Sequence, residues 1–294
     1  MNCDNFFQIG STHEVCQDYS LSKKIDENKS YIILSDGCSS SLNTDIGARI
    51  LTLCIKNEIE NDLLKQNLIP FIRINVSSCL DSSQKTIVEL ELPQEVLDAT
   101  SIFSLTNSCS TYCQILGDGI ITIKLKDETI LVIKNSYKNN YPFYMNYFNS
   151  EERLKSWCRV SKENIISFEK INKDKSIENI NLYTSKEENL WRILDSVVVM
   201  RNNYSFSVFF HNDPSFFDSI FLFSDGIESF YKISSSETSK INEPISFHEP
   251  IYNICNIKNK NENFLKRRLN TYLKQCQKDN IFHYDDLSVA SIVF

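Results

Sequence analysis

Residues 31–38 read YIILSDGC, a short apolar run that ends at an Asp-Gly pair, and residues 219–227 repeat this arrangement as SIFLFSDGI. A third copy, CQILGDGIITIK, occupies residues 113–124. Each apolar run has the length and composition of a buried strand. Because only six glycines occur in the 294 residues, three Asp-Gly pairs at strand ends indicate a shared role rather than scattered turns.

The segments that follow the three pairs differ from one another. Asp-Gly is a strong signal for a hairpin turn, and the alternating run IITIK directly after the pair at 118–119 predicts a hairpin there. No strand follows the pairs at 36–37 and 225–226 directly. Apolar positions at helical spacing predict a helix over 45–67, and a helical segment is expected after 225. In all, strands are expected around residues 31–35, 99–106, 110–125, 129–134, 219–223 and 287–293.

Further aspartates stand beside predicted strands. Asp285 and Asp286 precede the final apolar run, and Asp18 lies near the start of the chain. Any one of them alone is best explained as a solvated loop carboxylate. Together with the Asp-Gly aspartates they could face one cleft, where they would repel each other unless cations lay between them. Oxygen ligands without histidine or thiolate favour Mg²⁺ or Mn²⁺.

Composition excludes several other classes of protein. The chain has 38 acidic and 31 basic residues, so it offers no broad attractive field for nucleic acid. No run approaches the roughly 20 apolar residues of a membrane span, and the opening MNCDNFFQ lacks the features of a signal peptide. The ten cysteines are scattered without a C-x-x-C pair, which indicates reduced thiols in a cytoplasmic protein. Cys109 and Cys113 are expected on one face of a strand, as buried core residues.

Six segments taken in order resemble the metal-dependent serine/threonine protein phosphatases of the 2C type, especially the bacterial branch: GSTHEVCQD, ILSDG, DATSIFSL, ILGDG, LFSDG and DDLSV, from Gly10 to Val289. The resemblance implies an α+β fold, a four-layer α-β-β-α sandwich of two antiparallel sheets flanked by helices. It also implies a single catalytic domain over residues 1–294. The motif-free interval at about 135–218 is expected to include the flap, a mobile segment beside the cleft in that family.

The resemblance assigns roles to individual residues. Asp36 matches a carboxylate that bridges two Mn²⁺ or Mg²⁺ ions, and Asp36 and Asp225 are the central catalytic carboxylates. Asp18 matches an acidic residue that orders metal-bound waters, and Asp118 matches a ligand of a possible third ion. The complete set of metal-site residues implied by the resemblance is Asp18, Asp36, Gly37, Asp118, Asp225 and Asp285.

Several positions depart from the family pattern. His13 stands where many relatives carry a phosphate-binding arginine, and we take it as a catalytic candidate whose alternative is a structural role beside the first strand. Cys38 stands where eukaryotic relatives carry a histidine, and a small residue in a serine-rich turn is a better interpretation than a catalytic acid. Arg49 is a weaker candidate for phosphate contact than for a surface charge. His211 and His248 are interpreted as isolated histidines.

The expected activity is metal-dependent hydrolysis of phosphoserine and phosphothreonine in proteins by an activated water. Its partners would be phosphoprotein substrates and a cognate serine/threonine kinase, without nucleic acid or membrane. The alternative is a weak or inactive phosphatase-like domain that binds or senses a partner, which the changes at His13 and Cys38 favour. A serine hydrolase is excluded because the chain lacks a G-x-S-x-G elbow.

Overall fold

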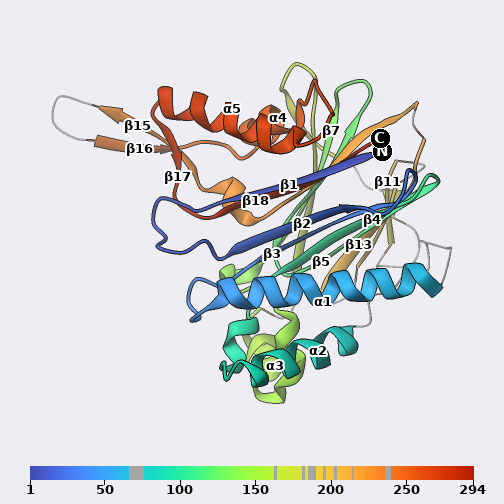
Figure 1. Ribbon diagram of the computed structural model, residues 1–294. Coiled ribbons are helices and arrows are strands. Elements are labelled where there is room, and N and C mark those ends of the chain that lie inside the picture. Colours follow the sequence, from blue (N-terminus) through green and yellow to red (C-terminus); the bar gives the residue numbers. More distant parts are fainter. Residues whose placement is uncertain are drawn as a thin grey trace.

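Two antiparallel sheets lie face to face at the centre of the computed structural model (Figure 1). The structure describes residues 1–65, 76–161, 164–180, 183–184, 190–194, 197–201, 204–213, 215–235 and 240–294. The first sheet has the order β1-β18-β14-β6-β7-β8-β9. Its strands are β1 (Asn2–Gln8), β6 (Gly119–Leu125), β7 (Ile130–Tyr137), β8 (Asn164–Ile171), β9 (Ile177–Asn179), β14 (Phe217–Phe223) and β18 (Leu287–Val293).

The second sheet has the order β10-β11-β12-β13-β5-β4-β3-β2. Its strands are β2 (Asp18–Lys24), β3 (Ser30–Asp36), β4 (Ser101–Thr106), β5 (Ser110–Leu116), β10 (Tyr183–Thr184), β11 (Leu190–Leu194), β12 (Val197–Arg201) and β13 (Ser205–His211). A separate small sheet has the order β16-β15-β17, formed by β15 (Phe230–Ser235), β16 (Lys240–Pro244) and β17 (Ile281–His283).

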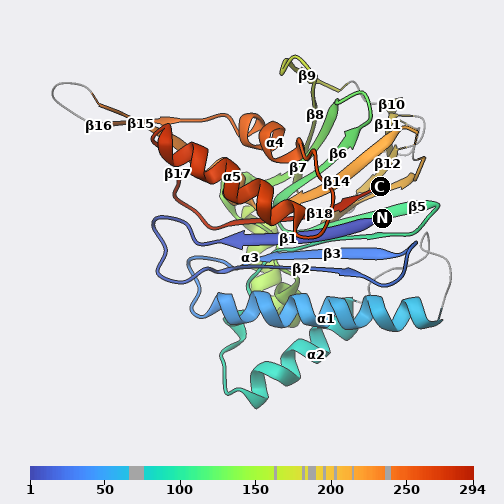
Figure 2. The ribbon, with the colours of Figure 1, turned by 45° about the horizontal axis from the view of Figure 1, so that its top comes forward.

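Helices cover the outer faces of both large sheets (Figure 2). Helices α1 (Thr44–Lys65) and α2 (Val76–Glu89) lie on the side of the second sheet, and α4 (His248–Cys255) and α5 (Phe264–Lys278) lie on the side of the first. Helix α3 (Glu151–Val160) follows the 3₁₀ helix η4 (Met145–Asn149), which contacts α2. The protein therefore has the α-β-β-α architecture that the family resemblance implied. The helix expected over 45–67 is confirmed as α1 up to residue 65, and residues 66–67 lie outside the described part of the chain.

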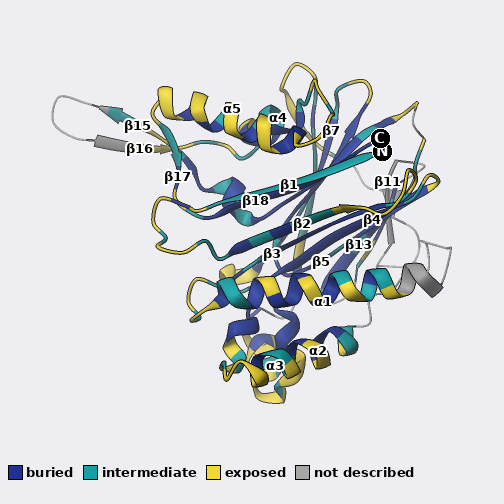
Figure 3. Ribbon diagram, viewed as in Figure 1, coloured by how far each residue is buried: buried dark blue, intermediate teal, exposed yellow. Residues whose placement is uncertain are grey.

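Three hydrophobic layers hold the four structural layers together. Because side chains alternate along β3, Ile32 and Leu34 enter the core between the sheets, whereas Tyr31 and Ile33 pack against α1. On the other side, α5 packs against the first sheet through residues that include Leu265. Figure 3 shows the buried faces of α1 and α5 turned toward the sheets and their exposed faces turned outward.

The Asp-Gly pair at 118–119 does not form the predicted hairpin. Strands β5 and β6 on its two sides belong to different sheets and do not pair with each other. The backbone crosses between the sheets through Gly117 and Gly119, whose φ angles of +101° and +135° lie in a region that favours glycine. Gly119 does adopt a positive φ, as a tight turn requires. However, β6 pairs with β14 and β7 and not with β5.

Two further local expectations were only partly correct. The helical segment after 225 is one turn of 3₁₀ helix, η5 (Asp225–Glu228), because the alternating residues beyond it enter β15. Cys113 is buried in β5, but Cys109 precedes that strand and is exposed. Among the described residues, no helix combines the length and the apolar character needed to cross a membrane.

Candidate functional site

Two of the predicted metal-site carboxylates lie at neighbouring strand ends. Asp36 is the last residue of β3 and Asp18 is the first residue of β2, and the register pairs them directly with each other. Like charges directly opposite each other in an antiparallel pair are destabilising unless something compensates for them. The local sequence therefore builds one half of an acidic site by strand pairing alone.

The other carboxylates reach the same place from distant parts of the chain. Asp118 lies in the crossing between the two sheets, Asp225 begins η5 at the end of β14, and Asp285 precedes β18. With Asp36 they line a cleft of about 290 Å³. The other lining residues are Gly37, Cys38, Ser39, Ser40, Thr100, Asn140, Pro142, Tyr144. Of the predicted metal-site residues, Asp18 alone is not part of this lining and lies behind Asp36.

The clustering raises the pKa values of these carboxyls. Burial raises the pKa of Asp36 well above its usual range, and the charges of Asp18 and Asp225 raise it further. Burial and the charge of Asp225 raise the pKa of Asp118 to about 8. Burial also raises the pKa of Asp285. Without a cation, the ionised cluster is therefore an unfavourable arrangement at neutral pH.

Asp18 is tied to the opposite sheet by one of its two oxygens. The Ser224 hydroxyl donates to Asp18 Oδ2 at 2.8 Å, and the Ser288 backbone N–H donates to the same hydroxyl at 2.9 Å. Asp18 Oδ1 is buried without a hydrogen-bond partner. An unpaired buried carboxylate oxygen is costly, and this one stands beside the acidic cleft.

The backbone around Asp36 is held from two sides. The Asp36 N–H donates to the Thr100 hydroxyl at 3.1 Å, and the Thr100 N–H donates to the Asp36 carbonyl at 2.8 Å. Position 37 must be glycine, because a Cβ there would lie 2.8 Å from Thr44 Cβ and 2.9 Å from the Gln17 carbonyl oxygen. These contacts fix the turn that presents Asp36 and the Gly37 carbonyl.

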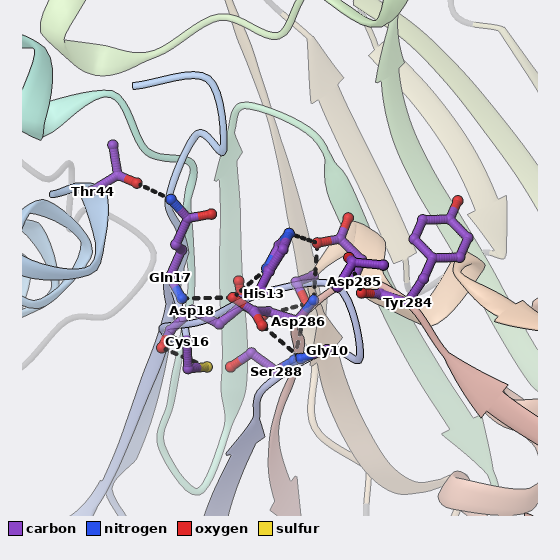
Figure 4. A network of polar contacts seen from close by, with 12 residues as sticks. Gly10, His13, Cys16, Gln17, Asp18, Thr44, Tyr284, Asp285, Asp286 and Ser288 are labelled. Carbon is purple, nitrogen blue, oxygen red and sulfur yellow. Dashed lines mark hydrogen bonds and ion pairs between the residues drawn. The ribbon is translucent and has the colours of Figure 1, made fainter. Parts of the chain in front are cut away.

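Asp286 organises the N-terminal loop behind the cleft (Figure 4). Its carboxylate accepts the backbone N–H groups of Gly10 at 2.7 Å and Gln17 at 2.6 Å. His13 lies between two carboxylates, with Nδ1 3.0 Å from Asp286 and Nε2 3.6 Å from Asp285. His13 does not line the cleft. The sequence showed that two aspartates are adjacent but not that they lie in different places. Asp285 lines the cleft, whereas Asp286 is buried behind it.

A network of hydrogen bonds around Asp98, which the sequence did not indicate, supports the part of the cleft wall that contains Cys38. Asp98 is buried and accepts hydrogen bonds from Arg153 Nη2 at 2.5 Å, Asn146 Nδ2 at 2.9 Å and the Ser41 hydroxyl at 3.2 Å. Its carbonyl accepts the Cys38 N–H at 2.8 Å. Arg153 lies in α3, inside the interval without family motifs. No local sequence pattern indicated that its partner would be Asp98. The expectation that this interval includes a flap remains a prediction.

Of the other residues that the sequence singled out, Cys38 lines the cleft, whereas Arg49 and His248 do not. The Cys38 thiol lines the cleft and lies 3.0 Å from the Ser40 hydroxyl. Arg49 is exposed and lies over the Tyr19 ring, away from the cleft lining. His248 is not isolated as expected, because its ring bridges the Ser246 hydroxyl at 2.8 Å and Glu169 Oε2 at 2.5 Å.

Comparison with known proteins agrees with the architecture. The chain is similar in structure to a bacterial serine phosphatase (11% identity, TM-score 0.52), covering 100% of this chain and 97% of that one. It is also similar to the serine/threonine phosphatase Stp1 from Staphylococcus aureus (11%, TM-score 0.53, 100% and 94%) and to serine-threonine phosphatase 2C from Toxoplasma gondii (10%, TM-score 0.52, 99% and 94%). At these identities the likeness concerns the fold alone.

The sequence comparisons give a family. No curated protein matches the chain significantly. The model of the family described as Protein phosphatase 2C matches residues 10–274, which is most of the chain. This chain belongs to the protein phosphatase 2C family.

Proposed function

We propose that this protein is a metal-dependent phosphatase that hydrolyses phosphoserine and phosphothreonine in proteins. The observation that carries the proposal is the convergence of five aspartates, from segments as far apart as β2 and the start of β18, at and behind one cleft. A buried group of carboxylates is costly to fold, and function is the usual reason for retaining one.

The residues suit hard divalent cations by their chemistry. All the side-chain donors are carboxylates, which are preferred ligands of Mg²⁺ and Mn²⁺. Asp18 Oδ1 lacks a partner, and burial, together with the charges of neighbouring carboxylates, raises the pKa values of Asp36 and Asp118. Among the described residues, no group of three or more His, Cys, Asp or Glu side chains has the arrangement of a preformed metal site. The fit therefore rests on ligand chemistry and charge.

The proposed ion-holding residues are Asp36, the Gly37 carbonyl, Asp225 and Asp285, with Asp18 behind them and Asp118 for a third ion. Two divalent ions, when bound there, would supply Lewis acidity toward the phosphoryl oxygens and would activate a water for attack. The carboxylates would fix where the ions sit. The positive charge of the ions would offset the negative charge of the carboxylates, so that a phosphate dianion could enter the cleft.

The chain's own residues supply preorganisation. The Thr100 contacts hold the Asp36 backbone, and Asp286 holds the loop that leads from Gly10 into β2. Ser39 and Ser40 place hydroxyl groups on the cleft wall, where they can donate to a phosphoryl oxygen or to the substrate backbone. Rigid support of this kind would hold the ion-binding carboxylates and the substrate in a fixed relative geometry.

The proposal is tested by hydrolysis of p-nitrophenyl phosphate and a phosphothreonine peptide, with Mn²⁺, with Mg²⁺ and after chelation. Metal-dependent release of phosphate by the wild-type protein, lost in Asp36→Asn, supports it. A folded wild-type protein that releases no phosphate from either substrate with either ion would contradict it. The partners implied are phosphoproteins and the serine/threonine kinase that modifies them.

A phosphatase-like binding domain is the second candidate, and one observation favours it. The cleft lining contains no lysine, arginine or histidine among the described residues, and both His13 nitrogens face carboxylates. A substrate phosphate would then depend on the ions for its positive charge. This candidate predicts that the wild-type protein binds Mn²⁺ and phosphopeptide but does not turn the peptide over.

A further inference from the structure

The small sheet beside the cleft carries three aromatic side chains on its outer face. In the β15–β17 pairing, Tyr231 stands opposite Phe282, so both side chains leave the same face of the sheet. Their ring centroids are 6.2 Å apart, and the Tyr231 ring is 6.4 Å from that of Tyr284. We call Tyr231, Phe282 and Tyr284 the aromatic strip.

The two faces of this sheet differ in what they contact. On the inner face, Phe230 stands opposite His283 and is buried in the core cluster beneath α5. None of the three strip residues belongs to a hydrophobic core cluster of the described part of the chain. Tyr284 is 50% exposed. Tyr231 and Phe282 are partly buried. Adjacent rings that pack on each other and are led by an exposed tyrosine have the character of a contact surface for another molecule.

The strip is continuous with the acidic cleft. Tyr284 directly precedes Asp285, a lining residue, and Figure 4 shows its ring beside Asp285 and turned away from His13.

Hydrogen bonds join the backbone of Tyr284 to two other segments, at Ser229 and at Thr12. Its N–H donates to the Ser229 carbonyl at 3.4 Å, directly after η5. Its carbonyl accepts the Thr12 N–H at 3.2 Å and the Thr12 hydroxyl at 2.6 Å. The backbone that carries the ring is therefore held at a defined place next to Asp285, as a preorganised contact requires. Strands β15 and β16 project from the body of the molecule (Figure 1).

We propose that the aromatic strip binds the polypeptide that flanks the phosphorylated residue, with a large apolar side chain of the substrate packed on Tyr284 and Tyr231. This inference rests on the proposed phosphatase function. An extended peptide advances about 3.3 Å per residue, so residues within a few positions of the phosphoserine reach from the cleft to the strip. Tyrosine rings provide broad contact at low entropic cost. The strip thereby selects phosphoproteins by an apolar residue near the modified serine.

The test uses two fluorescein-labelled phosphoserine peptides that are identical except for leucine or serine at the positions flanking the phosphoserine. Binding is measured by anisotropy in the presence of Mn²⁺, and kcat/KM is measured for both peptides and for p-nitrophenyl phosphate. The variants are Tyr284→Ala, Tyr231→Ala and the conservative Tyr284→Phe. Phe216→Ala is the matched control, because Phe216 is a partly exposed aromatic next to the far end of β14 from Asp225.

We expect the leucine peptide to bind wild type more tightly than the serine peptide. Tyr284→Ala and Tyr231→Ala should weaken its binding about five- to tenfold and raise its KM, whereas Tyr284→Phe and Phe216→Ala retain wild-type values. Hydrolysis of p-nitrophenyl phosphate should stay within about twofold, because this substrate is too small to reach the strip.

Equal binding of the two peptides by wild type would overturn the inference, and so would an equal loss for the peptide and the small substrate. If wild type binds the leucine peptide but hydrolyses nothing, the proposed enzymatic function fails while the anisotropy of the variants still decides the role of the strip. If wild type hydrolyses p-nitrophenyl phosphate but does not distinguish the peptides, the strip assignment fails and the phosphatase proposal stands.

Discussion

Asp18 and Asp36 are direct cross-strand partners, at the first residue of β2 and the last residue of β3. The pairing of two strands places the two carboxylates together before any other part of the chain contributes. Asp225 and Asp285 then join them from the other sheet. Burial and the charge of Asp18 raise the pKa of Asp36, so the fold concentrates negative charge where the proposed chemistry requires cations.

Removal of one charge from this cluster should abolish hydrolysis without unfolding the protein. Asp36→Asn and Asp225→Asn preserve side-chain volume and relieve repulsion, but each removes a proposed ion ligand, so kcat should fall about hundredfold or more. Steady-state kinetics at saturating Mn²⁺, with circular dichroism for the fold, measures both effects. Asp81→Asn is the control, because Asp81 is exposed on α2. Turnover near the wild-type rate in either cluster variant would remove that aspartate from the proposed site.

Mn²⁺ or Mg²⁺ should raise the melting temperature of the wild-type protein. A ligand at about one hundred times its Kd that binds only the folded state adds about 2.7 kcal/mol to the free energy of unfolding. Calorimetry with increasing Mn²⁺ measures the shift. Asp36→Asn should show a smaller shift than wild type, and equal shifts in the two proteins would argue for nonspecific ion binding.

In the metal-free protein, stability should fall as pH rises from about 4 to about 8. Burial raises the pKa of Asp118 to about 8, above the usual aspartate value near 3.9. A carboxyl with a raised folded-state pKa stabilises the fold while it is protonated, and that contribution is lost as pH rises through the folded pKa. Melting curves in EDTA across this range measure the slope.

Two comparisons identify the source of that slope. Asp118→Asn should have a shallower slope, because the amide does not titrate in this range. Millimolar Mn²⁺ should reduce the slope in wild type by compensating the ionised cluster. A metal-free slope that is flat or rises with pH would mean that these carboxyls are not buried together in solution.

The family resemblance implied the four-layer architecture, whereas individual strands and helix α1 followed from patterns that each element carries within itself. The alternation in β3 determines which side chains face the other sheet and which face α1, and the helical spacing of α1 matches that surface. Asp36, Asp118 and Asp225 could be singled out because each ends an apolar run, and Asp285 because it stands before one, whereas Asp18 carries no such signal; their role as ion ligands stays a prediction. What the sequence did not reveal was how elements distant in the chain meet.

The failed hairpin and the missed networks have the same physical cause. The turn at Gly119 could be recognised, but its flanking strands join different sheets, and that choice is made by partners such as β13 and β14. The contact between Asp98 and Arg153 likewise joins residues separated by 55 positions. A charged residue in a loop or helix gives no local sign of the partner it will meet after folding.

The Asp98–Arg153 contact should stabilise the wall of the cleft. Arg153→Met retains much of the packing over the Tyr147 ring but leaves the buried Asp98 without its cation, so the free energy of unfolding should fall by about 1–3 kcal/mol. Adding Asp98→Asn to this variant should recover part of the loss. Denaturant titration of the single and double variants measures the coupling, and strictly additive losses would contradict a specific pair.

The role of His13 is decided by kinetics measured together with stability. If His13 binds the substrate phosphate, His13→Ala should chiefly raise KM, with an additional fall in kcat only if the ring donates a proton. His13→Arg should then retain or improve phosphate binding, because a guanidinium carries a permanent charge and a bidentate fork.

The observed geometry offers a competing role for the same ring. His13 Nδ1 lies 3.0 Å from Asp286 Oδ2 and Nε2 lies 3.6 Å from Asp285 Oδ1, so the ring can position both carboxylates from behind the cleft. A purely structural His13 would lower the melting temperature on mutation to alanine and leave the kinetic constants of the folded fraction unchanged. An altered KM for p-nitrophenyl phosphate in a His13→Ala protein of wild-type stability would assign His13 to substrate binding. Unchanged KM and kcat in a destabilised protein would limit it to support of Asp285 and Asp286.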